Sequence, residues 1–234
     1  MERIKLWDLP VRIFHWTLAF CVVASFVAAK IGGNAMVWHG RFGVIMVGLL
    51  AFRLAWGLVG STHARFAQFV RGPGVIKAYL RGQWQGQGHN PLGALSVLAM
   101  LVTLILLVAT GLFANDDIAF EGPLYALVGK EFSDQAVGIH RLIEPLIILL
   151  VLAHLGAIAF YVRVRKQDLV RPMITGWKAM HGGIRSDGVG DTARGGGVAA
   201  LCFALTIALG AAYGASGVWI AQAPAPAASE TPAW

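Results

Sequence analysis

The stretch VGIHRLIEPLIILLVLAHLGAIAFYV, residues 137–162, decides the fold. It is almost wholly apolar and long enough to cross a lipid bilayer as one helix. Its two histidines, His140 and His154, are fourteen residues apart. In a helix they point to nearly the same side, about 40° apart, at depths that differ by ~21 Å. Because ionisable side chains in a membrane span are costly and are kept for function, this stretch predicts two metal centres stacked across a membrane.

The composition also indicates a membrane protein. Of 234 residues, 57% are hydrophobic and 13% are charged, whereas about a quarter are charged in a soluble domain. The net charge of +7 lies mainly in the links between apolar runs, so membrane topology explains it better than a nucleic-acid partner, and none is expected. There is no CxxCH motif, which excludes covalent c-type haem, and the two cysteines are too far apart to suggest a structural zinc cluster.

Lys and Arg residues give the orientation of the apolar spans. Five spans are predicted, at about 11–29, 38–60, 92–113, 137–162 and 197–220. The N-terminal segment and the second and fourth links are basic, whereas the link at 114–136 is acidic. Since basic links stay in the cytoplasm, the N-terminus is predicted to be cytoplasmic and the C-terminus periplasmic.

The predicted fold is all-α: a four-helix transmembrane haem-binding bundle with an additional fifth C-terminal transmembrane helix. The predicted units are a four-helix domain at 1–178, a cytoplasmic linker at 179–196, a fifth span at 197–220 and a disordered periplasmic tail at 221–234. The fifth span has no ionisable residue, which indicates an appended helix rather than part of a cofactor site. Its glycines favour close helix packing, at positions Gly210, Gly214 and Gly217.

The second link contains a basic segment with aromatic residues, 66–82. It suits a short helix in the membrane interface, broken at Gly72-Pro73-Gly74, and it suits a plain basic loop nearly as well.

Four histidines form two pairs by depth. His15 in the first span and His154 lie toward the cytoplasm, whereas His39, which opens the second span, and His140 lie toward the outer face. Each pair joins two different helices, as two axial imidazoles on a flat macrocycle must. A haem iron held by two histidines has no open coordination position, so such a site carries electrons. We therefore predict His15 with His154 and His39 with His140 as the metal ligands.

Other interpretations explain the histidines less well. A purely structural role, packed in the bundle or placed at the membrane interface, would explain any one of these histidines, especially His39 beside Trp38. It does not explain four histidines that are matched in depth. Zinc is disfavoured because two pairs a helix diameter apart do not build a tetrahedral site. The remaining histidines fall in cytoplasmic links and are interpreted as loop or surface residues, with a role near a quinone headgroup left open for the second: His63, His89 and His181.

Four arginines are candidate partners for the propionates of a b-type haem, because arginine is the preferred partner of carboxylates in a low dielectric. Arg41 and Arg141 flank the outer pair, and Arg53 lies inside a span near the inner pair. Arg12 precedes His15 by one turn, although anchoring at the cytoplasmic face explains it as well.

Several motifs occur in order along the chain: RIFHW (12–16), WHGRFG (38–43), FRLAWGLVGS (52–61), FVRGP (69–73), GHNPLG (88–93), TGLFANDD (110–117), the H-x13-H of 140–154 and RPMITG (171–176). Over roughly residues 5–178 the sequence resembles the bacterial cytochrome b561 family, which is itself similar to the b-type cytochrome subunits of hydrogenases. The resemblance implies a four-helix bundle in the inner membrane, two non-covalent haem b groups and the same four histidine ligands.

The resemblance also implies electron transfer between the membrane quinone pool and a periplasmic redox partner, such as a cytochrome c or a small oxidant like superoxide. The alternative is a haem-bearing anchor subunit of a hydrogenase or dehydrogenase complex. Quinone oxidoreductase activity, a homodimer and a complex subunit all stay open. The acidic link 114–136 would suit a basic cytochrome, although charge segregation explains its acidity at least as well. A haem-free transporter is disfavoured because no span shows a broken-helix pattern.

Overall fold

A computed structural model describes residues 3–70, 72–83, 90–118, 120–179 and 195–220 of the chain. Five of its helices are long and apolar enough to cross a membrane. They are α1 (Leu9–Ile31), α2 (Met36–Val59, preceded by the single turn η1, Gly33–Ala35), α5 (Pro91–Leu112), α6 (Lys130–Arg163) and α8 (Val198–Ala215). The predicted all-α membrane fold with five spans is confirmed, and α6 begins seven residues before the predicted span.

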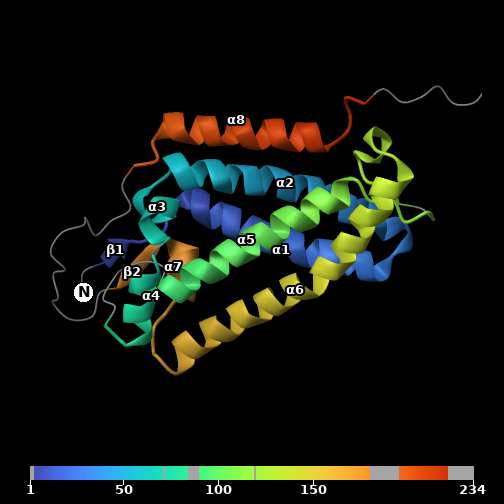
Figure 1. Ribbon diagram of the computed structural model, residues 1–234. Helices are drawn as coiled ribbons and strands as arrows, with labels where there is room; N and C mark the ends of the chain where they lie inside the picture. The colour runs from blue at the N-terminus through green and yellow to red at the C-terminus, as the bar shows by residue number, and fades with distance from the viewer. Residues whose placement is uncertain (1–2, 71, 84–89, 119, 180–194, 221–234) are drawn as a thin grey trace, which may run out of the picture.

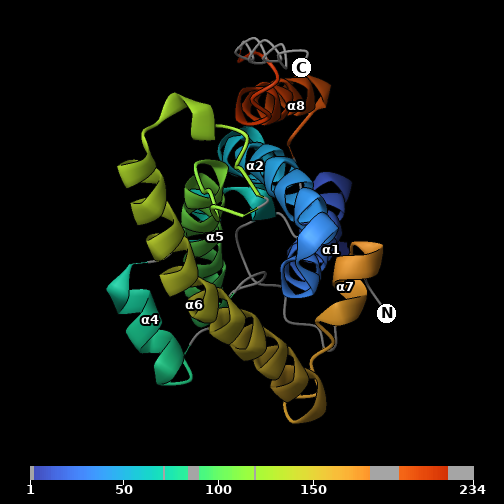
Figure 2. The same ribbon diagram turned by 90° about the vertical axis from the view of Figure 1, so that its right-hand side faces the viewer.

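Four of these helices, α1, α2, α5 and α6, form the bundle, and α8 lies outside it against α2 (Figures 1 and 2). Large apolar side chains from α1, α2 and α5 meet in the core, among them Phe14, Trp56 and Leu101. The helix α6 contains Pro145, which removes one helical hydrogen bond, and α6 is visibly bent in Figure 1. Few of its side chains are buried, as expected for a helix whose outer face contacts lipid.

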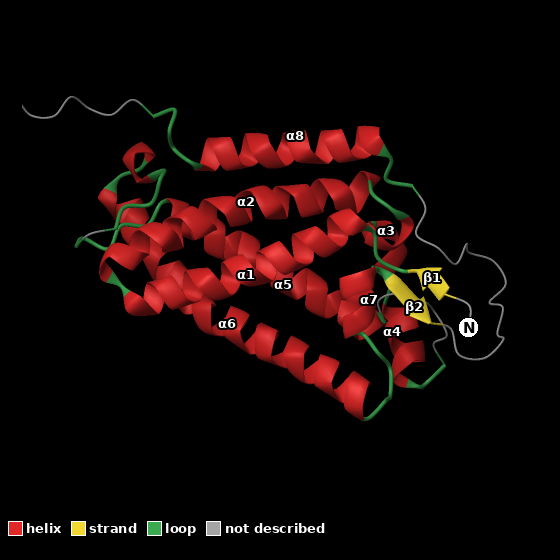
Figure 3. Ribbon diagram, turned by 180° about the vertical axis from the view of Figure 1, so that it is seen from behind, coloured by secondary structure: helices red, strands yellow, loops and turns green. Residues whose placement is uncertain are grey.

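Short elements gather at the two ends of the bundle (Figures 1 and 3). At one end lie η2 (Thr62–Ala64), α3 (Phe66–Phe69), α4 (Pro73–Leu80), α7 (Val170–Thr175) and the strands β1 (Arg3–Lys5) and β2 (Trp177–Ala179). The two strands are antiparallel, with Ile4 opposite Lys178. We name this the basic end. The opposite, acidic end carries η1, the loop 113–129 and η3 (Tyr125–Leu127).

The helices begin where the sequence supplies caps. Asp8 accepts a hydrogen bond from the backbone N–H of Val11 at 2.7 Å, and Asn90 does the same for Gly93 at 2.7 Å. Each cap is followed by a proline near the first turn, where the missing N–H costs nothing. The described part of segment 66–82 contains two short helices, α3 and α4, rather than a plain loop, and α4 begins at Pro73. The predicted place of this segment in the membrane interface stays a prediction.

The fifth helix packs through alanines rather than through the predicted glycines. Gly48 of α2 is the close-contact point: a Cβ there would lie 3.2 Å from the carbonyl oxygen of Ala208 and 3.2 Å from Cβ of Ala212. By contrast, a Cβ at Gly210 or Gly214 would meet nothing within 4 Å. These two glycines therefore make no close contact with α2, and the close packing predicted at them is wrong. A Cβ at the third, Gly217, would clash with the carbonyl oxygen of Pro123, so this glycine is closely packed against the loop at the acidic end.

Candidate haem sites

His39 on α2 and His140 on α6 face each other near the acidic end. Their ring centroids are 6.1 Å apart, and the ring planes are inclined by 75°. A metal–imidazole bond is about 2 Å long, so two imidazoles on opposite sides of one metal ion have centroids about 6 Å apart. The spacing of the two rings therefore fits a pair of axial ligands.

Each of these rings is held through Nδ1. In His39, Nδ1 lies 3.0 Å from both the carbonyl oxygen and the hydroxyl of Ser25. In His140, Nδ1 lies 2.9 Å from the carbonyl oxygen of Leu107 and 3.2 Å from the hydroxyl of Thr110. Because a carbonyl oxygen only accepts hydrogen bonds, the proton of each neutral ring is assigned to Nδ1, and Nε2 keeps its lone pair. This tautomer can bind a metal through Nε2.

Both rings line a cavity of about 440 Å³ between α1, α2, α5, α6 and the loop at the acidic end. Its wall is mostly apolar, and a Cβ at Gly43 would point into open space. Gly111 lets His140 approach α5, since a Cβ there would lie 3.2 Å from Cε1 of that ring. An apolar cavity with two opposed imidazoles fits a flat macrocycle that carries a central metal. Within the described ranges no group of three or more His, Cys, Asp or Glu side chains could hold a metal by itself.

His15 on α1 and His154 on α6 form the second pair, toward the basic end. The two imidazoles are close enough for their charges to interact. Both are half-buried, and Nδ1 of His15 is shielded from solvent without a hydrogen-bond partner. A buried polar atom without a partner is costly, so this position fits a site that is completed by a further group.

Residues 6–176 match the model of a family described as prokaryotic cytochrome b561. The chain belongs to the prokaryotic cytochrome b561 family. This cytochrome is therefore a multi-pass membrane protein that transfers electrons through haem b. No solved structure matches it.

Curated relatives of the cytochrome carry the name "probable Ni/Fe-hydrogenase B-type cytochrome subunit". The protein from Rhizobium leguminosarum bv. viciae is 24% identical, and the alignment covers 75% of this chain and 88% of the relative. Those from Azotobacter chroococcum mcd 1 and Azotobacter vinelandii are each 26% identical with the same coverage.

Of the four predicted arginine partners of the cytochrome's haems, only Arg141 lines the described cavity. Arg41 is exposed, and its guanidinium lies 4.8 Å from the ring centroid of Trp38. Arg12 donates a hydrogen bond from Nη1 to the carbonyl oxygen of Ile174 in α7, while its Nε is buried without a partner. The structure therefore brings one of these arginines to the cavity of the outer pair.

Arg53 is buried at the basic end of α2, with 4% of its surface exposed. Its guanidinium lies over two rings, 4.7 Å from the centroid of Phe66 and 5.7 Å from that of Phe69, in cation–π contacts. It also interacts electrostatically with Asp8. One of its nitrogens, Nη1, is buried without a hydrogen-bond partner.

An ion pair beside the outer cavity escaped the sequence analysis. Lys30, in the last turn of α1, lies 2.8 Å from the carboxylate of Glu144, which lines the cavity one turn after His140. The hydrogen-bond partners of the two outer rings, Ser25 and Thr110, were missed as well. The sequence signal that could have found Ser25 and Thr110 is that each is a polar residue inside an apolar span.

The remaining histidines lie away from both pairs or outside the description. His63 lies in η2, where its Nε2 is buried without a partner. Burial lowers the pKa of His63 below its ordinary value. His89 and His181 lie outside the described residues, as do Arg71 and the predicted tail at 221–234.

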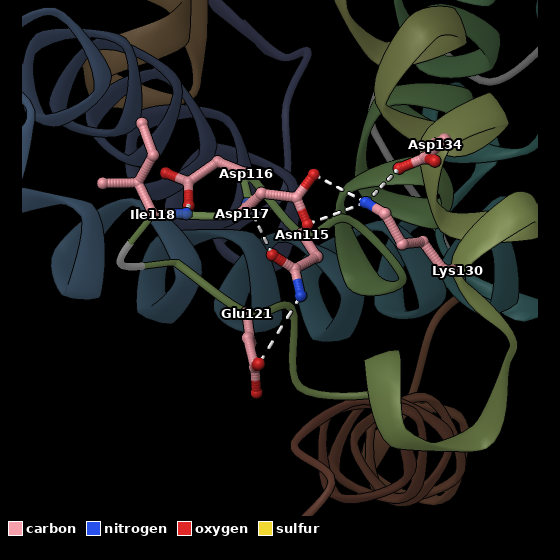
Figure 4. Close-up of polar contacts among 7 residues, drawn as sticks. All are labelled: Asn115, Asp116, Asp117, Ile118, Glu121, Lys130 and Asp134. Atoms are coloured by element: carbon pink, nitrogen blue, oxygen red, sulfur yellow. Dashed lines mark hydrogen bonds and ion pairs between the residues drawn. The ribbon is translucent and has the colours of Figure 1, made fainter.

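The acidic link is partly neutralised by one lysine (Figure 4). Lys130 lies 2.6 Å from the carboxylate of Asp117 and 3.2 Å from that of Asp134. All three side chains are more than half exposed, so these ion pairs add little stability. Asn115 and Glu121 form a further polar contact of 3.5 Å beside them.

Proposed function

We propose that this cytochrome carries electrons across the inner membrane through two haem b groups. One would be bound by His39 and His140 and the other by His15 and His154. The main support for this proposal is the geometry of His39 and His140. Their ring centroids are 6.1 Å apart, and Nδ1 of each ring is hydrogen-bonded to a backbone carbonyl oxygen. Ligands held this way are oriented before the metal binds.

Two axial histidines per iron leave no open coordination position, so each haem supplies one-electron transfer rather than substrate binding. The chain's own part is to fix the rings and exclude water from the outer cavity. His140 and His154 lie on one helix, and at 1.5 Å per residue they are about 21 Å apart along its axis, so one proposed site would lie toward each end of the bundle. This arrangement supports electron movement from one side of the membrane to the other.

We further propose that the basic end faces the cytoplasm and the acidic end the periplasm, following the positive-inside rule. Electrons would be exchanged with the quinone pool within the membrane and with a redox partner at the periplasmic face. The exposed acids near the acidic end would favour a partner with a basic surface, such as a cytochrome c.

A second candidate is a haem-bearing subunit of a hydrogenase complex. The relatives carry that name and align over 75% of this chain. Membrane extraction in a mild detergent separates the two candidates. A dehydrogenase or hydrogenase that co-purifies in equal amounts supports the second, whereas a free protein that still exchanges electrons supports the first.

Reduction by a quinol tests the quinone link. The purified protein is mixed anaerobically with a short-chain ubiquinol or menaquinol, and the haem absorption is followed against a dithionite-reduced reference. We expect the quinol to reduce a substantial part of the haem that dithionite reduces. Haem that dithionite reduces and neither quinol does would overturn the proposed quinone link.

A further inference from the structure

At the acidic end of α5, the described residues 115–118 and 120–121 form a segment whose two ends, Asn115 and Glu121, lie side by side. These two residues form an antiparallel bridge, and backbone hydrogen bonds of 2.7 and 3.1 Å flank it. Gly122 lets the chain lie close to the end of α5, because a Cβ there would lie 2.5 Å from the carbonyl oxygen of Leu112. The position of the segment is therefore fixed by backbone contacts.

The carboxylate of Asp116 fixes the segment from inside. Its Oδ1 accepts hydrogen bonds from the backbone N–H of Ile118 at 3.0 Å and from that of Phe120 at 2.9 Å. Figure 4 shows the carboxylate of Asp116 beside Ile118. One side-chain oxygen thus accepts from two backbone N–H groups, so Asp116 determines where the backbone of Phe120 lies.

The side chain of Phe120 packs against the outer histidine pair. Its ring meets the ring of His39 nearly at right angles, with centroids 6.1 Å apart and an interplanar angle of 82°. It also lies against α2 at Gly40, where a Cβ would come within 3.0 Å of Cε2 of Phe120. Phe120 lines the same cavity as both histidines.

The ring of His39 is thus held from two sides. Ser25 holds Nδ1 by hydrogen bonds, and the side chains that pack against the ring further limit its orientation. Phe120 makes such a contact from the loop at the acidic end, on the ring that also faces His140 of α6. Aromatic rings favour an edge-to-face arrangement of this kind, so the contact favours one orientation of the His39 ring.

We infer that Phe120 is a positioning residue for His39, and that Asp116 holds Phe120 in place. This inference rests on the proposed function of His39 as an iron ligand. Phe120 keeps the His39 ring in its orientation and excludes water and small molecules from that side of the site. A haem bound here would then keep both histidine ligands and be limited to electron transfer.

The test uses the purified haem-loaded protein and two readouts other than activity. The first is carbon monoxide binding to the dithionite-reduced protein, which requires a histidine to leave the iron. The second is the low-field signal of the ferric protein in electron paramagnetic resonance, which depends on the angle between the two axial rings. For Phe120→Ala we expect carbon monoxide binding at the outer haem and a shifted, broadened signal, with Phe120→Tyr close to the wild type.

Asp116 supplies the matched control. Asp116→Asn keeps an acceptor oxygen for the two N–H groups and removes the charge, whereas Asp116→Ala removes both. We expect Asp116→Ala to reproduce the changes of Phe120→Ala and Asp116→Asn to resemble the wild type. If both Asp116 variants show the same change in carbon monoxide binding and in the resonance signal, the charge of Asp116 matters rather than its hydrogen bonds, and its assigned role is wrong.

The outcomes separate the inference from the proposed function. A normal haem content with carbon monoxide binding and resonance signal unchanged in Phe120→Ala overturns the inference and leaves the proposed function intact. Wild-type protein without haem overturns both. If Phe120→Ala does not retain the outer haem, Phe120→Leu, which keeps an apolar side chain without the ring, replaces it under the same two criteria.

Discussion

Asp8 joins three parts of the basic end through one carboxylate. Its Oδ1 caps α1 at Val11, and its Oδ2 accepts hydrogen bonds from Nε1 of Trp56, at 3.0 Å, and from the hydroxyl of Ser61. It also provides a negative charge close to buried Arg53. The N-terminus of α1 and the C-terminal end of α2 are therefore tied together by a single residue.

Replacing Asp8 is expected to destabilise the protein strongly. In Asp8→Ala, loss of the cap costs about 1 kcal/mol, and each buried donor left without a partner costs about 1–3 kcal/mol. Asp8→Asn keeps an acceptor for the cap and should lose less. The measurement is the unfolding midpoint in detergent by circular dichroism. As a control, Asp168→Ala removes two exposed hydrogen bonds to the backbone N–H groups of Val170 and Arg171 in the first turn of the short α7. Equal midpoints for Asp8→Ala and Asp168→Ala would contradict the assigned role of Asp8.

His63 should give the stability of the protein a dependence on pH. Because burial lowers its pKa in the folded state, the unfolded chain binds a proton more readily below the ordinary pKa of about 6.5. The contribution of His63 is therefore fully present above that pH and is lost as the pH falls further. Unfolding midpoints measured from pH 8 down to pH 5.5 should fall less steeply in His63→Gln than in the wild type. Parallel profiles would show that His63 does not contribute.

At the scale of the elements, the contact between α2 and α8 depends on small residues. Gly48 of α2 meets Ala208 and Ala212 of α8 closely, while Gly210 faces open space. The sequence indicated a packed fifth helix but not which of its faces is packed. Glycine and alanine both permit close approach of helices. Which face of α8 lies against α2 depends on tertiary packing, and the order of small residues in the sequence does not show it.

Overpacking at Gly48 tests this contact. Gly48→Leu should push α8 away from α2 and cost about 1–3 kcal/mol, with the haem content unchanged because α8 does not line the described cavity. Gly210→Leu adds the same side chain on the opposite face and should have little effect. Unfolding midpoints and haem-to-protein ratios of the two variants provide the comparison. The same loss of stability in both would contradict the proposed contact face.

The spans and the histidine pairs were predictable, whereas the polar groups around them were not. Apolar length and histidine spacing are local properties of the chain, and they were sufficient to pair His39 with His140 by depth. The carbonyl partners of these rings and the contact of Phe120 depend on how α1, α5 and the acidic loop lie against α2 and α6. The same holds for Arg41. Its position two residues after His39 suggested a haem partner, but the sequence does not show that its guanidinium lies over the ring of Trp38.

At the scale of the whole molecule, charge is segregated between the two ends. The described links at the basic end carry more Lys and Arg than Asp and Glu, whereas residues 114–136 carry five acids against one lysine, Lys130. Cytoplasmic links of membrane proteins are enriched in Lys and Arg. The basic end should therefore face the cytoplasm.

Cysteine labelling in intact cells tests this orientation. In a background with Cys21 and Cys202 replaced by serine, single cysteines are placed at two exposed positions, Lys5→Cys at the basic end and Glu131→Cys at the acidic end. A membrane-impermeant maleimide should label Glu131→Cys directly and Lys5→Cys only after permeabilisation. The reverse pattern would show that the orientation is inverted.

The most direct measurement of the central claim is the haem content of single histidine variants. Reduced-minus-oxidised spectra and pyridine haemochrome quantitation are made on the wild type and on His39→Ala, His140→Ala, His15→Ala and His154→Ala, with His63→Ala as the control. We expect two haems b per chain in the wild type and control and about one in each of the four variants, with the same spectral component lost within each pair. No haem in the wild type, or loss that does not follow the pairs, would contradict the account.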